Sequence, residues 1–415
     1  MKVLWFTHMP SNASSYLNYK SDRCGWVSSL ENELSKKNNI DLAVAFYHKH
    51  KEKPFTIGKV KYYPIYSGLE NKIKKWLFKY NGGLESEKDI KKYIDVINDF
   101  NPDIIHIHGT ESAFGLIIPY IKIPVVISIQ GNLTVCNHKF FSGLQKSDLY
   151  KNCSFKDILQ IKHFLFSKNS YEKKSERERK ILGYTNHVIG RTDWDRRITR
   201  ILAPNASYYF NDEMLRNSFY QNNWQPNESG NKVIFSTIGD NPYKGLETIW
   251  GSIELLNKSE NIIWKVAGVD ENSQITRILK SKFKEKVPKN LILLGSVNEK
   301  ELVEELLNSD LYIHPSHIEN SPNSVCEAMI LGLPIIATFA GGTNSLFTDK
   351  KEGILIQDGD PFSMAGAIKE IFNNYAKAIL YGELARKRAL NRHNKTKILN
   401  ELIAIYEKIQ NRKFI

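Results

Sequence analysis

Two glutamates eight positions apart, Glu319 and Glu327, are the residues in this sequence whose type and spacing most clearly suggest chemistry. Carboxylates accept hydrogen bonds from vicinal hydroxyl groups, which are the groups that sugars and ribose offer. A spacing of eight also arises by chance, so the elements that carry the pair decide whether it forms a site. Those elements favour a site that binds a sugar nucleotide.

The segment between the two glutamates predicts the beginning of a helix directly after a strand at residues 311–314. Ser321 is a favoured N-cap residue, Pro322 suits the first helical position, and Gly332 is a natural end. The free N–H groups at this helix start would belong to Asn323, Ser324 and Val325. A helix N-terminus at the carboxyl end of a parallel strand binds anions, and a diphosphate fits it.

Short apolar strands alternate with helical stretches along both halves of the chain. In the first half we expect strands at residues 2–6, 41–46, 104–107, 124–129 and 187–190. In the second half we expect them at residues 233–238, 263–268, 291–294, 311–314 and 334–338. This alternation predicts an α/β protein with parallel, doubly wound sheets. A polar stretch at residues 221–231 reads as a connection between domains.

The formal net charge of +13 is compatible with three partners: nucleic acid, an anionic membrane surface or an anionic small molecule. The sequence has no zinc finger, ribonucleoprotein motif or helix-turn-helix signature, so no nucleic acid is expected. The four cysteines lack the spacing of a zinc site or a disulfide framework, which favours a reducing compartment. No segment is apolar enough to span a bilayer, and the N-terminal apolar run is too short for a secretory signal. We therefore expect a cytoplasmic protein.

Several motifs in the second half resemble the retaining glycosyltransferases of family 4. The two glutamates are followed by Ala-Met-x-x-Gly-Leu-Pro-Ile-Ile-Ala-Thr at residues 328–338 and by Gly341-Gly342. Residues 243–246 resemble the family's Lys-Gly motif, and residues 294–297 resemble its base-contacting segment. In the first half, residues 101–109 resemble its Pro-Asp-x-x-His strand. The resemblance is strongest over residues 232–357.

The resemblance implies the GT-B fold, in which two Rossmann-like domains face each other across a cleft. We expect residues 1–215 to form the N-terminal, acceptor-side domain and residues 216–392 the C-terminal domain that binds the nucleotide sugar. Residues 393–415 would form a C-terminal helix that returns to the N-terminal domain.

The family's site roles carry over to matching positions of this sequence. Glu319 would contact the transferred sugar, and Lys244 would stabilise the leaving diphosphate together with the helix start at residues 323–325. Glu327 would bind the ribose, and Val297 would lie against the base. Gly25 would belong to the glycine loop near the phosphates, and His108 and Gln130 would contact the acceptor or the sugar. His108 is assigned to the cleft side of its strand, with His106 facing the opposite side. The resemblance implies retention of configuration, and neither a metal nor a cofactor is expected.

Two positions depart from the family pattern. An aspartate, Asp240, stands where the family commonly has a phosphate-binding arginine, so either this side chain points away or the motif is placed wrongly on this segment. Another cation such as Arg191 could take the place of the arginine. Gln130 stands where many members have a histidine. Glutamine donates hydrogen bonds but cannot act as a general base.

These observations favour a retaining glycosyltransferase that uses a nucleotide sugar and a glycan or lipid-linked acceptor in cell-surface polysaccharide or lipopolysaccharide biosynthesis. Two alternatives stay open. One is a nucleotide-sugar epimerase or a phosphorylase on the same fold, and the other is a non-catalytic nucleotide- or carbohydrate-binding subunit. The basic, aromatic segment at residues 72–80 could lie on the inner face of an anionic membrane or could pack inward.

Overall fold

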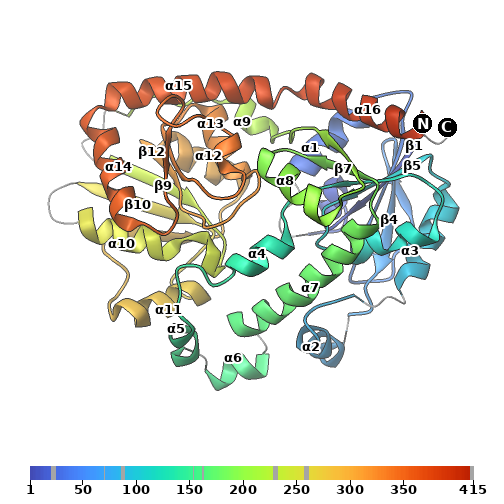
Figure 1. Cartoon of the computed structure of the whole chain (residues 1–415), viewed down its shortest axis with the longest axis horizontal. Helices are drawn as coiled ribbons and strands as arrows, with labels where there is room; N and C mark the ends of the chain where they lie inside the picture. Colours follow the sequence, from blue (N-terminus) through green and yellow to red (C-terminus); the bar gives the residue numbers. More distant parts are fainter. Residues whose placement is uncertain are drawn as a thin grey trace. The chain divides into compact units, whose positions relative to one another are not determined.

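The computed structural model describes residues 1–19, 25–69, 71–85, 89–152, 154–160, 163–227, 232–256 and 261–411. The chain forms two compact units (Figure 1). The first unit contains residues 1–137, 166–216 and 393–415, and the second contains residues 138–165 and 217–392. Each unit has its own sheet, so each is described separately.

The first unit is built on an eight-stranded sheet with the order β3-β4-β2-β1-β5-β6-β7-β8. Its strands are β1 (Lys2–Thr7), β2 (Asp41–His48), β3 (Phe55–Ile57), β4 (Val60–Tyr66), β5 (Ile104–His108), β6 (Val125–Ser128), β7 (His187–Gly190) and β8 (Ser207–Phe210). Strand β3 pairs antiparallel with β4, and the other neighbours are parallel. The predicted doubly wound parallel sheet is therefore confirmed.

Helices cover both faces of this sheet. They include α1 (Gly25–Leu34), α2 (Lys72–Tyr80), α3 (Ile90–Phe100), α4 (Leu133–Lys139), α7 (Phe164–Tyr184), α8 (Asp193–Leu202) and α16 (Lys395–Asn411), with 3₁₀ turns η1 (Ser11–Ser14) and η3 (Ala113–Tyr120). Alternate residues of β1 belong to two different hydrophobic clusters: Trp5 packs in one and Phe6 in the other. Burial on both faces explains why this strand is a continuous apolar run.

The C-terminal helix α16 belongs to the core of the first unit. Its Tyr406 hydroxyl accepts a hydrogen bond from Trp5 Nε1 at 3.1 Å and is hydrogen-bonded to His106 Nδ1 at 2.6 Å. These contacts join the last helix of the chain to β1 and β5, the two central strands.

The second unit is built on a six-stranded parallel sheet with the order β11-β10-β9-β12-β13-β14. Its strands are β9 (Lys232–Thr237), β10 (Ile262–Ala267), β11 (Leu291–Gly295), β12 (Leu311–His314), β13 (Ile335–Thr338) and β14 (Ile354–Ile356). Its helices include α5 (Lys146–Lys151), α6 (Phe155–Gln160), α9 (Asn217–Gln221), α10 (Leu246–Leu256), α11 (Gln274–Phe283), α12 (Glu299–Leu307), α13 (Asn323–Leu331), α14 (Pro361–Asn373) and α15 (Tyr375–Arg392), with 3₁₀ turns η4 (Pro242–Lys244) and η5 (Thr343–Ser345). Helix α13 packs against both α9 and α15 (Figure 1).

The expected boundary of the N-terminal domain is wrong for residues 138–165, which lie with the second unit. Lys282 Nζ donates to the carbonyl oxygen of Gly143 at 2.7 Å, and Arg277 pairs with Asp157 at 3.4 Å. Both cations are on α11, more than a hundred residues further along the chain. Contacts between such distant positions cannot be read from local sequence pattern.

Four strands were not expected from the sequence: β3, β4, β8 and β14. Strand β4 contains Pro64, which removes a backbone donor, and β3 and β14 have only three residues each. Among the described residues, no helix combines the length and the apolar character that crossing a bilayer requires.

Candidate functional site

The topological switch point of the second sheet lies between β9 and β12. The chain adds β10 and β11 on one side of this point and β13 and β14 on the other. The crevice outside the carboxyl ends of strands at such a point is the usual ligand site of a doubly wound sheet. Lys244 follows β9 and Glu319 follows β12, so the structure places both predicted residues at this position.

Lys244 and Glu319 form an ion pair there through Nζ and Oε1. Glu319 Oε1 also accepts a hydrogen bond from Ser316 Oγ at 3.2 Å, and His314 Nε2 lies 3.9 Å from it. Burial raises the pKa of Glu319, but the Lys244 charge and the other neighbours outweigh it, so the pKa is lowered overall. Burial lowers the pKa of His314 to about 4. The site therefore holds an ionised carboxylate, a cation and a neutral imidazole near neutral pH.

Glycines allow the loops of this site to approach one another. Gly245 has a φ of +80°, and a Cβ there would lie 2.2 Å from the carbonyl oxygen of Pro315. Gly341 has a φ of +59°, and a Cβ there would lie 1.9 Å from the carbonyl oxygen of Glu319. The N–H of Gly342 donates to this same carbonyl at 2.9 Å. The Gly-Gly pair thus fixes the backbone of the glutamate that the sequence singled out.

His317, for which the sequence favoured a structural role over a catalytic one, links its own loop to three other segments of the second unit. Its Nε2 lies 2.6 Å from Glu247 Oε1, its Nδ1 lies 3.1 Å from Asp358 Oδ2, and its backbone N–H donates to Tyr243 O at 2.8 Å. Burial lowers the pKa of His317, but its bonds to the two carboxylates outweigh it, so the pKa is raised. The imidazole ring therefore ties the Glu319 loop to the start of α10 and to Asp358, and the backbone N–H of His317 ties it to the Lys244 turn. A lone histidine after Pro-Ser gave no signal of this role.

Helix α13 begins at Asn323, one residue later than an N-cap at Ser321 would place it. Its N-cap is Pro322, which has no side-chain acceptor. The N–H of Val325 donates to the carbonyl oxygen of Pro322 at 3.0 Å, so the expectation that it is free is wrong. In the part of the chain that the structure describes, the N–H groups of Asn323 and Ser324 make no hydrogen bond. The Oδ1 atom of Asn323 is buried and also lacks a partner among these residues.

The remaining predicted residues of the second unit lie on the same side of its sheet. Glu327 is buried on α13, with 5% of its surface exposed, and the helix ends at Gly332 in the left-handed conformation, as predicted. Val297 is half-buried just beyond the end of β11. Parallel strands end at one edge, so these positions share the edge that carries Lys244 and Glu319.

The Asp240 carboxylate lies at the N-terminus of α11. It accepts hydrogen bonds from the backbone N–H groups of Gln274 at 3.1 Å and Ile275 at 2.9 Å. These are the first residues of α11, so Asp240 occupies the N-terminus of that helix, where a negative charge is stabilising.

In the first unit, His108 is packed among aromatic rings. It is 3% exposed, its ring stacks on that of His106 with centroids 3.9 Å apart, and its edge contacts Trp5 at 4.5 Å. The assignment of the two histidines to opposite faces is wrong, because residues two apart on a strand share a face. Burial holds the pKa of His108 well below its usual value. This packing leaves His108 little surface for contact with an acceptor.

Gln130 is half-buried directly after β6 and lies beside Glu111 and Gly109. Gly109 has a φ of +91°, and a Cβ there would lie 1.9 Å from Glu111 Oε2. Burial raises the pKa of Glu111 to about 7, with the nearby charge of Glu178 adding to the effect. Glu111 is therefore a titratable neighbour of Gln130 at the carboxyl edge of the first sheet.

Gly25 opens α1, and a Cβ there would lie 2.7 Å from the Arg216 side chain. Arg191, considered as a replacement for the missing arginine, is 5% exposed. It pairs with Glu213 at 3.6 Å and lies 4.2 Å over the ring of Trp26. Its charge is thus balanced inside the first unit.

Comparisons with known sequences agree with this geometry. Residues 219–388 match the family described as Glycosyl transferases group 1. An uncharacterised glycosyltransferase of Methanocaldococcus jannaschii is 30% identical over 186 residues, which are 44% of this chain and 46% of that protein. TuaC of Bacillus subtilis, described as a candidate teichuronic acid biosynthesis glycosyltransferase, is 23% identical over 65% of this chain and 61% of its own length. The chain thus spans less than two thirds of these relatives.

Comparison with solved structures extends the likeness to the whole chain. Sucrose-phosphate synthase from Thermosynechococcus elongatus superposes with a TM-score of 0.73 at 15% identity and covers 99% of each chain. At this identity the likeness concerns the fold, which is GT-B with two parallel-sheet α/β domains. This chain has the GT-B fold, and its residues 219–388, which carry Lys244, Glu319 and Glu327, match the glycosyl transferases group 1 family.

Proposed function

We propose that this chain is a glycosyltransferase that moves a sugar from a nucleotide-sugar donor to a hydroxyl group of a glycan or lipid-linked acceptor. The observation that carries the proposal is the Lys244–Glu319 pair at the switch point of the second sheet. The same edge carries the start of α13, where the N–H groups of Asn323 and Ser324 make no hydrogen bond to any residue that the structure describes. A cation, a carboxylate and N–H dipoles together suit a diphosphate linked to a polyhydroxylated ring.

Each residue has a role in the proposed reaction. Glu319 accepts hydrogen bonds from the hydroxyls of the transferred sugar, Glu327 binds the ribose, and Val297 lies against the base. Lys244 and the start of α13 stabilise the negative charge that grows on the leaving diphosphate. The acceptor oxygen bonds to the anomeric carbon as the bond to the phosphate oxygen breaks, and the acceptor proton passes to the leaving diphosphate.

Retention of configuration and independence from metal complete the proposed mechanism. Attack on the face that the diphosphate leaves would retain the configuration, and it lets the diphosphate take the proton directly. Lys244 and the N–H groups of α13 would supply the charge stabilisation that a metal provides in other sites.

The proposed biological role is assembly of a cell-surface polysaccharide or a similar glycoconjugate. Support comes from the relative TuaC, whose description names teichuronic acid biosynthesis. Acceptors for such polymers are held at membranes, and this chain carries an exposed helix suited to a membrane surface.

This exposed helix is α2, in which no side chain is buried. Ile73 is 68% exposed and Tyr80 is 59% exposed, and Trp76 stacks on Tyr80 with ring centroids 5.3 Å apart. Four lysines, Lys72, Lys74, Lys75 and Lys79, lie on the same helix. Exposed aromatic groups beside lysines are typical of helices that lie in an anionic membrane interface.

Replacing these four lysines with glutamine should reduce pelleting with vesicles of anionic lipid by at least tenfold, since each lysine contributes about 1 kcal/mol near such a surface. Removal of four exposed lysines from the second unit is the matched control: Lys284, Lys286, Lys289 and Lys300. Equal loss of pelleting in both variants would mean that the lysines of α2 contribute no more to membrane binding than other exposed lysines. Unchanged pelleting of the α2 variant would remove the membrane surface from the proposal.

A nucleotide panel tests the donor site directly. We expect one of UDP, GDP, ADP, CMP or dTDP, at a hundredfold excess over its Kd, to stabilise the protein by about 2.7 kcal/mol. This corresponds to a rise in Tm of roughly 5–10 °C. Glu327→Ala should abolish the rise, because Glu327 would bind the ribose. The exposed Glu304→Ala on α12 should retain it.

Two further outcomes separate the alternatives. Loss of donor without an acceptor, with formation of an isomer, would identify an epimerase. A nucleotide-dependent rise in Tm without transfer to any acceptor from extracts of the producing cell would favour a binding subunit. Absence of any rise with all five nucleotides would contradict the proposed donor site.

A further inference from the structure

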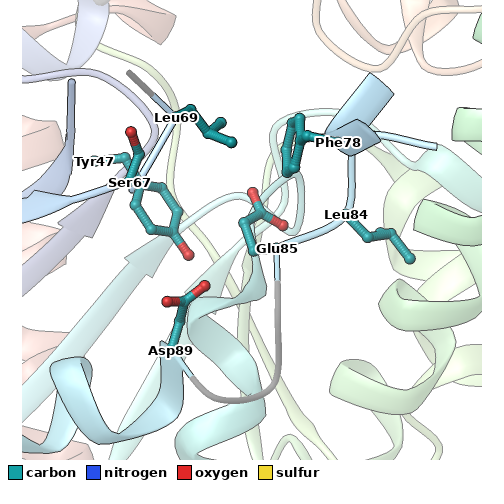
Figure 2. Close-up of a pocket in the computed structure, with 7 residues that line it drawn as sticks. All are labelled: Tyr47, Ser67, Leu69, Phe78, Leu84, Glu85 and Asp89. Atoms are coloured by element: carbon teal, nitrogen blue, oxygen red, sulfur yellow. The ribbon is translucent and has the colours of Figure 1, made fainter. Parts of the chain in front are cut away.

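A cavity of about 340 Å³ lies within the first unit, and none of the residues assigned above lines it. Its apolar and aromatic walls are Tyr47, Leu69, Phe78 and Leu84, and its polar groups come from Ser67, Glu85 and Asp89 (Figure 2). This volume is at the lower end of the range for small-molecule sites, which suits a mono- or disaccharide unit.

The cavity lies at the carboxyl edge of the first sheet, at the ends of two strands next to the switch point between β1 and β5. Tyr47 lies near the end of β2, and Ser67 directly follows β4. These parallel strands end at the same edge as β1 and β5, and ligands bind outside the carboxyl ends of the strands in such sheets. Phe78 from α2 and Asp89 at the start of α3 close the other sides.

The two carboxylates of the cavity are each paired with a cation behind them. Glu85 pairs with Arg177, and Asp89 Oδ1 lies 2.6 Å from Lys92 Nζ. Asp89 is the N-cap residue of α3, yet its side chain makes no capping hydrogen bond to the helix. Figure 2 instead shows its carboxylate pointing toward the Tyr47 hydroxyl. The cavity is thus rich in hydrogen-bond acceptors without a large net charge.

Tyr47 is held in a fixed orientation. Its ring stacks on Phe114 with centroids 4.9 Å apart, and its hydroxyl contacts that of Tyr93. Burial and the neighbouring Tyr93 raise the pKa of Tyr47, so its hydroxyl keeps its proton. The cavity wall thus carries a neutral hydroxyl group there.

We propose that this cavity binds a neutral, hydroxyl-bearing sugar ring of the acceptor glycan, an inference that rests on the proposed glycosyltransferase activity. The carboxylates of Glu85 and Asp89 would accept hydrogen bonds from sugar hydroxyls, and Phe78 offers an apolar surface to the ring's C–H groups. A diphosphate would meet two carboxylates and be repelled. A prenyl chain would cover the carboxylates without offering hydrogen bonds, which costs free energy.

The test is saturation-transfer NMR with the methyl glycosides of glucose, galactose, mannose and N-acetylglucosamine, without a donor present. Leu69→Trp fills the cavity, and Leu77→Trp makes the same change on the exposed side of α2 as a control. Asp89→Asn removes one carboxylate with almost no change in volume, so it remains informative if Leu69→Trp fails to fold. We expect at least one glycoside to bind the wild type and Leu77→Trp, with binding lost in Leu69→Trp and about three- to tenfold weaker in Asp89→Asn.

Glycoside binding that is unchanged in Leu69→Trp and Asp89→Asn would overturn the proposal. So would binding of farnesyl phosphate in place of all four glycosides, which would assign the cavity to a lipid chain. If no glycoside binds while a nucleotide still raises the Tm, only this inference fails. If neither a glycoside nor a nucleotide binds, both this inference and the proposed function fail.

Discussion

Glu319→Gln and Lys244→Met should each lower kcat/KM for sugar transfer by roughly 10²–10³-fold, the usual effect of losing one preorganised group that stabilises developing charge. The first change removes a charged acceptor for sugar hydroxyls, and the second removes the cation beside the leaving diphosphate. Because the two side chains contact each other, the double variant should lose less than the sum of the two effects in free energy. Initial rates of transfer with the donor identified by the nucleotide panel measure all three variants.

The second unit offers a matched control for this experiment. Lys265 and Glu305 form an ion pair at 2.7 Å, with 27% and 26% of their side chains exposed, close to the 22% and 18% of Lys244 and Glu319. This pair joins β10 to α12. Lys265→Met and Glu305→Gln should therefore leave kcat/KM within about twofold, since such ion pairs contribute little. Full activity of Glu319→Gln would refute the assigned role.

The second large effect is expected at His317, where Glu247 and Asp358 hold a proton on a buried imidazole. Because the pKa of His317 is raised in the folded protein, its stabilisation is complete below the unfolded value of about 6.5 and is lost as the pH rises through the folded pKa. His317→Gln should lower stability by about 2–3 kcal/mol at pH 6, the contribution of hydrogen bonds to charged groups. In Tm this is roughly 5–10 °C.

The difference in Tm between wild type and His317→Gln should be largest at pH 6 and should shrink as the pH rises above 6.5 toward and through the raised pKa of His317. Thermal unfolding at pH 6 and at pH 9 measures the change. His50→Gln, at an exposed histidine of the first unit, should follow the wild type throughout. A difference that stays constant with pH would mean that His317 acts through packing alone.

Local pattern was sufficient for the central elements of both sheets, because strands buried on two faces are short apolar runs that alternate with helices. Local pattern was insufficient for elements that are stabilised by strand pairing or by tertiary packing. Strand β4 carries Pro64 in its interior and strand β14 has three residues, so neither gives a distinct apolar run. The start of α13 was misplaced because its N-cap is Pro322 and not the better capping residue before it.

The sequence by itself determined the α/β class, the glutamate pair on either side of a helix start, the end of that helix at Gly332 and the lysine after β9. These follow from periodicity, from the conformational freedom of glycine and from motif spacing. Only the tertiary structure decided which residues these side chains contact. It brought Lys244 to Glu319 across 75 positions, Asp240 to the first residues of α11, and Asp358 to His317. Such contacts arise where the loops of a parallel sheet meet at one edge, and their free energy depends on burial and distance that no single stretch of sequence contains.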